Sequence, residues 1–248
     1  MKIGTVLVRG MLAGLLAAVL AFAFASVFGE PQVDNAIAVE EAGAGHDHGG
    51  AAEPGAEEEE VVSRGVQSTL GLAVATGAYG LAFGGLFALA FAFSYGRVGR
   101  LSARATAGVL GIVAFVTVFL VPFLKYPSNP PAVGQPDTIN TRTTWYFVMV
   151  LISVVAAIAA TVLASRLAAR LGSWNAVLLG VLGYLVVVGV AALLLPVVNE
   201  VPEGFPASLL WNFRVASLGT QLLLWAGIGL LFGVFIERAT RRVAAARA

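Results

Sequence analysis

Six long apolar runs, separated by short polar segments, dominate the chain. None contains Asp, Glu, Lys, Arg or His, and they cover residues 10–29, 68–93, 105–124, 143–165, 174–198 and 215–236. A helix needs about 20 consecutive apolar residues to cross the hydrocarbon core of a bilayer. The pattern predicts an all-α integral membrane protein with six transmembrane helices, forming a single polytopic domain over residues 1–248 in contact with membrane lipid.

The first apolar run has two interpretations. The small residues of Ala23-Phe-Ala25 near its end are typical of a signal-peptide cleavage site. The apolar core of a signal peptide is normally about 7–15 residues long, and this run is longer. We therefore expect a first helix that is retained.

Residues 30–67 have a different composition from the rest of the chain. They are rich in Gly, Ala and Glu, and ten of the 14 acidic residues lie between Glu30 and Glu60. Such a segment cannot bury enough apolar surface to become ordered by itself. We expect a flexible, acidic loop.

The positions of the basic residues predict the orientation. The N-terminus, two short connecting turns and the C-terminal tail hold 11 Lys and Arg residues, whereas the other three loops hold four. Loops rich in Lys and Arg stay on the cytoplasmic side. Both termini are therefore predicted to be cytoplasmic, with the acidic loop and two proline-rich loops facing outward.

The two proline-rich loops, residues 120–132 and 195–207, match each other. At an offset of 74 positions (196 − 122), and with one extra residue in the second loop, three prolines align: Pro122 with Pro196, Pro127 with Pro202, and Pro131 with Pro206. An arginine follows each loop, at Arg142 and Arg214. The match predicts a parallel duplication of a two-helix hairpin with a proline-rich outer loop. The alternative is convergent loop chemistry at helix ends.

Composition excludes several functions. The chain is 58% hydrophobic and 12% charged, against about 25% charged residues in soluble domains. It has no cysteine, which removes disulfides, thiolate metal sites and cysteine catalysis. Its basic residues lie at helix ends, which argues against a nucleic acid partner. With two histidines and no Ser/His/Asp set within reach, we do not expect an enzyme.

The acidic loop carries a candidate metal site at His46, Asp47 and His48. Imidazole suits several divalent transition metals, and nearby carboxylates attract any cation. The alternative interpretation is a solvated acidic tether with no defined site.

A second candidate site lies at the outer ends of the spans. Asn199 and Glu200 supply oxygen ligands beside a helix C-terminus, whose partial negative charge favours a cation. We predict a metal-handling Glu200 within a gate formed with Lys125, Arg142, Asn199 and Arg214. Lys125 would lie near Glu200, and both arginines would hold it and loop carbonyls through bidentate hydrogen bonds. The alternative is that each residue only anchors its helix end.

Any pathway through the spans must use uncharged groups. Proton-coupled carriers usually place ionisable residues within their spans, and none occurs in these runs. Such a pathway would have to use Ser, Thr, Tyr79, Asn175, Tyr184, Gln221 or backbone oxygens.

Three motifs carry a family resemblance. They are Leu120-Val-Pro-Phe-Leu-Lys-Tyr-Pro-x-Asn-Pro-Pro-Ala-Val-Gly, Thr-Ile-x-x-Arg142-Thr and Pro-x-x-Asn-Glu-x-Pro-x-Gly-Phe-Pro-Ala-x-x-Leu-Trp-x-Phe-Arg214. With the acidic, His-bearing loop, they resemble the predicted cobalt transporter subunit family, CbtA. The resemblance implies a multi-pass subunit of the prokaryotic cytoplasmic membrane for cobalt uptake, in the context of cobalamin biosynthesis.

The same resemblance implies a small His-containing membrane partner subunit. It also implies cobalt(II), or another divalent cation, as the transported ion, without a covalently bound cofactor. It favours the metal interpretation of the acidic loop. The alternative function is a non-transporting membrane scaffold or metal-sensing partner, which would have a dry, packed bundle instead of a polar path. The sequence leaves the energy source and homo-oligomerisation open.

Overall fold

The computed structural model describes residues 2–44, 62–97, 99 and 101–245. This part of the chain is 85% helical and contains no strand. The elements, including short π-helical turns labelled η, are α1 (Ile3–Phe24), η1 (Ala25–Gly29), α2 (Glu30–Ala44), α3 (Arg64–Val66), η2 (Gln67–Gly71), α4 (Leu72–Ser94), α5 (Ala103–Ala114), η3 (Phe115–Leu120), α6 (Val121–Lys125), α7 (Pro136–Leu171), α8 (Ser173–Leu194) and α9 (Ala207–Ala245).

Six helical segments in the described residues are long and apolar enough to cross a membrane, which confirms the six predicted spans. They are Ile3–Ala42, Arg64–Ser94, Ala103–Lys125, Asp137–Leu171, Ser173–Leu194 and Ala207–Arg241. Most extend beyond the charge-free runs, because a helix continues into the polar interface after its apolar part ends. The first helix, for example, begins at Ile3 and not at Gly10.

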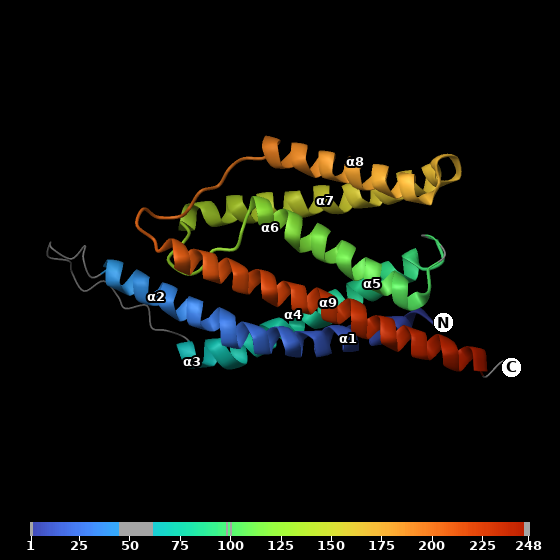
Figure 1. Ribbon diagram of the computed structural model, residues 1–248. Coiled ribbons are helices and arrows are strands. Elements are labelled where there is room, and N and C mark those ends of the chain that lie inside the picture. The colour runs from blue at the N-terminus through green and yellow to red at the C-terminus, as the bar shows by residue number, and fades with distance from the viewer. Residues whose placement is uncertain (1, 45–61, 98, 100, 246–248) are drawn as a thin grey trace.

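The helices form two groups (Figure 1). α7 and α8 pack along each other, whereas α1 packs on both α4 and α9. The continuous helix made of α5, η3 and α6 joins the groups, because α5 packs on α9 while η3 and α6 pack on α7.

Both termini lie at the same end of the bundle, which we call the terminal end (Figure 1). α2, α3 and the two proline-rich connections lie at the opposite end, the loop end. An even number of spans requires this arrangement. Which end faces the cytoplasm still rests on the distribution of basic residues.

Glycines allow α1 and α4 to approach closely. Gly10 and Gly14 on α1 face Gly80 and Gly84 on α4, and a Cβ atom built on Gly80 would lie 2.5 Å from the Gly14 carbonyl oxygen. Small residues at such positions let helices pack backbone to backbone in a membrane. Gly80-x-x-x-Gly84 is such a small-residue motif, and α1 is the helix that approaches it.

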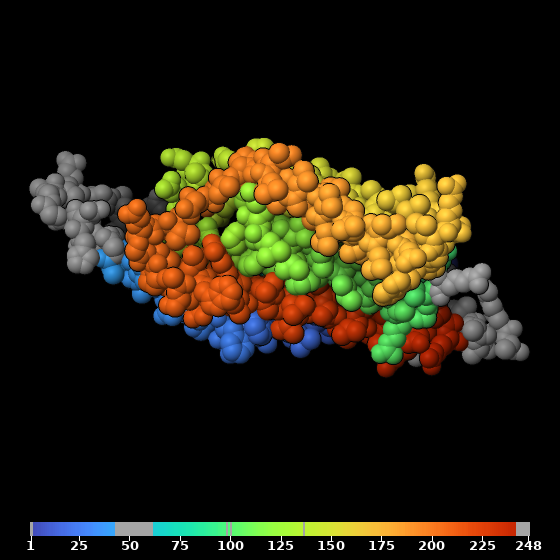
Figure 2. All heavy atoms as spheres, turned by 45° about the horizontal axis from the view of Figure 1, so that its top comes forward, coloured from blue at the N-terminus to red at the C-terminus, as the bar shows by residue number. Residues whose placement is uncertain are grey.

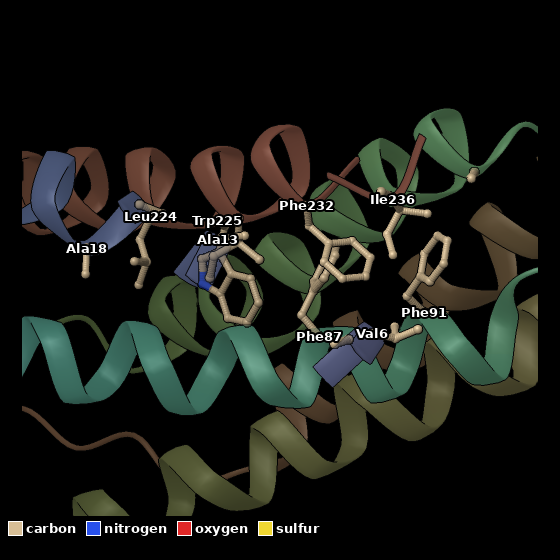
Figure 3. Close-up of a cluster of buried hydrophobic side chains, with 14 of the residues drawn as sticks. Val6, Ala13, Ala18, Phe87, Phe91, Leu224, Trp225, Phe232 and Ile236 are labelled. Carbon is tan, nitrogen blue, oxygen red and sulfur yellow. The ribbon is translucent and has the colours of Figure 1, made fainter. Parts of the chain in front are cut away.

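An aromatic cluster fills the centre of the α1, α4 and α9 group toward the terminal end (Figure 3). Phe232 packs edge to face against Phe87 and Phe91, with ring centroids 5.4 and 5.0 Å apart. Trp225 makes the same type of contact with Phe83, at 5.4 Å. These rings leave this part of the bundle apolar and tightly packed.

The prediction that residues 30–67 form a flexible loop is wrong at both ends. Residues 30–44 form α2, and residues 64–67 begin the second helical segment. Arg64 forms ion pairs with Glu30 and Asp34, the second with 2.9 Å between nitrogen and oxygen. α2 also packs on α9 and buries Ala36 completely. Tertiary contacts therefore stabilise a helix that the local composition does not predict.

The two hairpins related by the predicted duplication do not pack alike. α7 lies along α8, but α4 packs mainly on α1, and α5 mainly on α9. The duplication stays a prediction. Its two proline-rich loops nevertheless converge in space, at the site described next.

Candidate functional site

The two proline-rich loops contact each other at the loop end. The first leaves α6 at Tyr126, and the second connects α8 to α9. The Tyr126 hydroxyl donates a hydrogen bond to the Pro196 carbonyl oxygen, at 2.8 Å. The Tyr126 side chain is buried, which raises the pKa of its phenol and keeps it a neutral donor. In Figure 2 the orange α8–α9 connection arches past the green end of α6.

A tight turn shapes the first loop. Ala132 has φ 64° and Gly134 has φ 147°, and the Val133 amide donates to the Pro130 carbonyl at 3.2 Å. Val133 is buried beneath the turn. A Cβ atom on Gly134 would lie 4.0 Å from Glu200 Oε2, so the turn brings its backbone beside that carboxylate.

Glu200, in the second loop, is the centre of the site. Its side chain is only 1% exposed. Arg142 Nη1 donates to Oε2 at 2.6 Å, Asn129 Nδ2 donates to the same oxygen at 3.3 Å, and the Thr138 hydroxyl donates to Oε1. A buried carboxylate needs such partners, because an uncompensated charge is costly to desolvate. The N-terminal turns of α7, which carry Thr138 and Arg142, also favour negative charge.

Arg214 extends the network to α9. Its Nη2 donates to Asn129 Oδ1 at 3.0 Å, and its Nε donates to the Ser128 carbonyl oxygen at 3.3 Å. Asn129 thus bridges Glu200 and Arg214, with its amide donating to one and accepting from the other. We call the five side chains Asn129, Thr138, Arg142, Glu200 and Arg214 the Glu200 network; it ties both loops to the starts of α7 and α9.

A pocket of about 230 Å³ lies beside the Glu200 network. Its walls are mostly aromatic, with Arg142, Ser128 and Thr143 as polar members, and the full lining is Phe119, Phe123, Tyr126, Pro127, Ser128, Arg142, Thr143 and Tyr146. The Ser128 hydroxyl is buried in the structure without a hydrogen-bond partner. The lining of the pocket therefore combines apolar residues with one charged residue, Arg142, and four residues that carry a hydroxyl group: Tyr126, Ser128, Thr143 and Tyr146.

Comparison with protein families decides the classification. The family described as probable cobalt transporter subunit (CbtA) matches residues 3–237. The chain belongs to the CbtA family. The match includes all six spanning helices and both proline-rich loops. It places the chain among multi-pass proteins of the prokaryotic cytoplasmic membrane that act in cobalt transport. No curated protein and no solved structure matches it.

The structure brings together three of the five residues predicted for the CbtA gate: Arg142, Glu200 and Arg214. Lys125 is not among the partners of Glu200 in the described residues; its ammonium lies 5.7 Å from the centre of the Tyr126 ring. Asn199 is exposed, and its side chain accepts a hydrogen bond from the Val201 amide, at 3.4 Å. The Glu200 carboxylate bonds to α7 and to the first loop instead, and the proximity of Lys125 and Glu200 stays a prediction.

Two members of the network, Asn129 and Thr138, were not selected from the sequence. Both are uncharged, so a search for charged residues at the ends of the spans does not find them. The available signal was their place in the family motifs, where Asn129 stands between prolines and Thr138 opens the segment that ends at Arg142.

The metal-ligand predictions have different outcomes. His46, Asp47 and His48 lie outside the described residues. In the residues that the structure describes, no group of three or more His, Cys, Asp and Glu side chains could hold a metal ion. Both oxygens of Glu200 already accept hydrogen bonds. In this arrangement the carboxylate ties the second loop to the first loop and to α7, and Arg142 occupies the oxygen Oε2.

Proposed function

We propose that this chain is the membrane subunit of a divalent-metal uptake transporter, with cobalt(II) as its cargo. The family match over residues 3–237 supports the class. The observation that carries the mechanism is the buried Glu200–Arg142 pair beside a pocket that opens at the loop end. A buried ion pair contributes little net stability compared with apolar packing. The best-attested role of a buried ion pair is to select one conformation among several. A gate needs a residue pair with this role.

The Glu200 network acts as an outer latch in this proposal. A divalent cation that reaches the carboxylate competes with the Arg142 guanidinium for Oε2, the oxygen that both would bind. When Arg142 leaves, the second loop loses its main attachment to α7. The loop end then opens and admits the cation to the bundle. Oxygen ligands and a local negative charge are sufficient for such transient capture.

Two further elements complete the proposal. His46, Asp47 and His48 capture cations and raise their concentration near the latch. A partner completes the transporter, because the family is one of subunits; a small membrane protein with histidines fits a cargo that imidazole binds well.

A second candidate function is a metal-sensing scaffold without transport. It is favoured by the absence of a ready metal cluster from the described residues and by the apolar packing at the terminal end. The two functions differ in whether cobalt accumulates inside the cell.

Uptake of radiolabelled cobalt in cells lacking their own cobalt importers tests the proposal. The chain is expressed with its genomic neighbours, without them, and as Glu200→Ala, and the neighbours are also expressed without the chain. We expect accumulation only with the neighbours present, and a clear loss with Glu200→Ala. Equal accumulation with and without this chain, at confirmed expression, would contradict transport and favour the scaffold.

A further inference from the structure

Two buried polar atoms on α9 have no hydrogen-bond partner in the described residues. They are the indole nitrogen of Trp225 and the amide oxygen of Gln221. Trp225 is 3% exposed. The two residues are four positions apart, so they lie on the same face of α9, one turn from each other. One atom is a donor and the other an acceptor. Buried polar atoms without partners are rare, and a bound water or ion is a common explanation.

Other polar groups connect this pair to the pocket. The Gln221 side chain lies within hydrogen-bonding reach of the Tyr79 hydroxyl on α4, and Tyr79 stacks on Phe83 with ring centroids 4.2 Å apart. Tyr146 on α7 lies near enough to influence the ionisation of the Tyr79 hydroxyl. Tyr146 lines the pocket beside the Glu200 network. Polar side chains from α4, α7 and α9 therefore succeed one another from the loop end inward. They include Tyr79 and Gln221, two of the uncharged residues that the sequence offers for a pathway.

These groups lie roughly halfway through the bundle. α4, α7 and α9 all run from the loop end to the terminal end (Figure 1). Gln221 is 14 positions from the start of its span (221 − 207), and Tyr79 is 15 from the start of its own (79 − 64). At about 1.5 Å per residue both lie roughly 20 Å from that end. Beyond them, Trp225 packs on Phe83, and the Phe87, Phe91 and Phe232 rings close the way to the terminal end (Figure 3).

We propose that the pocket continues inward as a water-filled half-channel that ends at Gln221 and Trp225, and that Gln221 is the resting site of the transported cation. A water molecule accepts a hydrogen bond from Trp225 and donates one to Gln221 in the empty state. When a hydrated divalent cation enters, the Gln221 amide oxygen and the Tyr79 and Tyr146 hydroxyls accept hydrogen bonds from its water ligands. Neutral oxygens hold such an ion weakly enough for it to leave again. The cation part of the proposal rests on the proposed function, whereas the half-channel does not.

Cysteine accessibility tests the half-channel, because the chain contains no cysteine of its own. Gln221→Cys is compared with Thr143→Cys at the pocket and with Ser153→Cys, a nearly isosteric change at a fully buried position on α7 that hydrogen-bonds Tyr184. A charged, membrane-impermeant thiol reagent is applied to sealed vesicles of both orientations, so the result does not depend on which end is cytoplasmic.

We expect Gln221→Cys to react at least about tenfold faster than Ser153→Cys from the loop end only, because the reagent needs a thiolate in contact with water. Equal, slow reaction of the two variants would overturn the half-channel, whatever the transport activity. Cobalt uptake by Gln221→Leu and Gln221→Glu then tests the resting site. We expect about a tenfold loss at low cobalt for Leu, and retention for Glu, which keeps an oxygen at that position.

The outcomes separate the two proposals. Normal uptake by Gln221→Leu, in a chain that transports cobalt, would overturn the resting site and leave the transporter function intact. A reactive Gln221→Cys in a chain that never accumulates cobalt would support the half-channel and contradict the transporter function.

Discussion

Glu200 is a buried charged residue in a connecting loop, which is the position that the proposed latch requires. Its carboxylate is almost completely buried, yet it lies in a loop and its main partner, Arg142, keeps 28% of its side chain exposed. The pair is therefore stable when it is intact but close enough to water to open. Removal of Glu200 would leave the neighbouring donors without an acceptor, so we expect it to affect the fold.

The first prediction concerns the strength of this pair. Glu200→Ala leaves Arg142, Asn129 and Thr138 without their common acceptor, and we expect a loss of about 3 kcal/mol, the range for breaking a buried pair. The double variant with Arg142→Ala should lose clearly less than the sum of the two single changes. Apparent unfolding midpoints of the purified protein in detergent measure both effects.

The exposed Arg241–Glu237 pair is the matched control. It joins residues four apart on α9, with Arg241 78% exposed, and such pairs contribute only about 0.3–0.5 kcal/mol. If the double-mutant cycle of Glu200 and Arg142 gives a coupling energy as small as that of this control pair, Glu200 is not a latch and its burial has another cause.

The second prediction separates the two arginines. Arg214 uses two guanidinium nitrogens on two different acceptors, Asn129 and Ser128, whereas Arg142 makes its ion pair through one nitrogen. A lysine carries one compact ammonium and cannot reproduce a two-pronged arrangement. We therefore expect Arg214→Lys to lower cobalt uptake and thermal stability more than Arg142→Lys does. Equal effects of the two variants would contradict the role assigned to Arg214.

At the scale of the elements, glycine faces decide which helices pack together. α1 and α4 approach at four glycines, and α9 approaches α5 through Gly229, whose Cβ would lie 3.3 Å from the Ala107 carbonyl oxygen. In a membrane the hydrophobic effect does not drive helices together, so close contact of this type replaces it.

The third prediction tests this packing. Gly80→Ala puts a methyl group 2.5 Å from the Gly14 carbonyl oxygen and 2.7 Å from Ala18 Cβ. Because backbone cannot move aside easily, we expect a loss of about 1–3 kcal/mol. Gly183→Ala in α8 is the control, since nothing lies within 4 Å of its Cβ position. There the helix propensity of alanine should make the change neutral or slightly stabilising. If the two variants have similar midpoint temperatures of thermal unfolding, the close contact between α1 and α4 does not contribute to stability.

The elements also show what the sequence can and cannot predict. The six spans follow from local composition, and so does the close approach at Gly80-x-x-x-Gly84. The partner of that glycine pair does not, because α1 is chosen by tertiary packing. α2 was missed for the same reason, since Arg64 stabilises it from 34 positions away at Glu30. The two aligned proline-rich loops are each followed by an arginine, and this pattern indicated Arg142 and Arg214. No local sequence pattern indicates that Asn129 bridges Glu200 and Arg214.

For the whole molecule, the Glu200 network lies where the two helix groups meet. α7 and α8 pack on each other and on η3 and α6, whereas α9 packs with α1, α4 and α5. The network reaches α7 through Thr138 and Arg142, and α9 through Arg214. In the proposed mechanism, opening the network would release one group from the other at the loop end. The aromatic cluster of Phe87, Phe91 and Phe232 packs the terminal end. Alternating access requires one end to open while the other stays sealed, and the proposal assigns these roles to the Glu200 network and the aromatic cluster.

The fourth prediction concerns the acidic segment of the chain between α2 and α3. Residues 45–61 contain six acidic side chains and both histidines of the chain. Replacing them with a Gly/Ser linker of the same length keeps α2 and the ion pairs of Arg64. We expect the half-saturating cobalt concentration to rise by about tenfold with an unchanged maximal rate, because the segment concentrates cations locally and is not part of the path.

Ionic strength and selective variants distinguish capture by charge from capture by imidazole. An electrostatic contribution shrinks as salt rises, because ions screen charges beyond about 8 Å at physiological ionic strength. Changing Glu57, Glu58, Glu59 and Glu60 to Gln should therefore reproduce part of the defect in low salt only. His46→Ala with His48→Ala should act at any salt concentration, because ligation by imidazole is not screened in this way. Loss of transport at saturating cobalt in a correctly folded linker variant would instead make the segment part of the path.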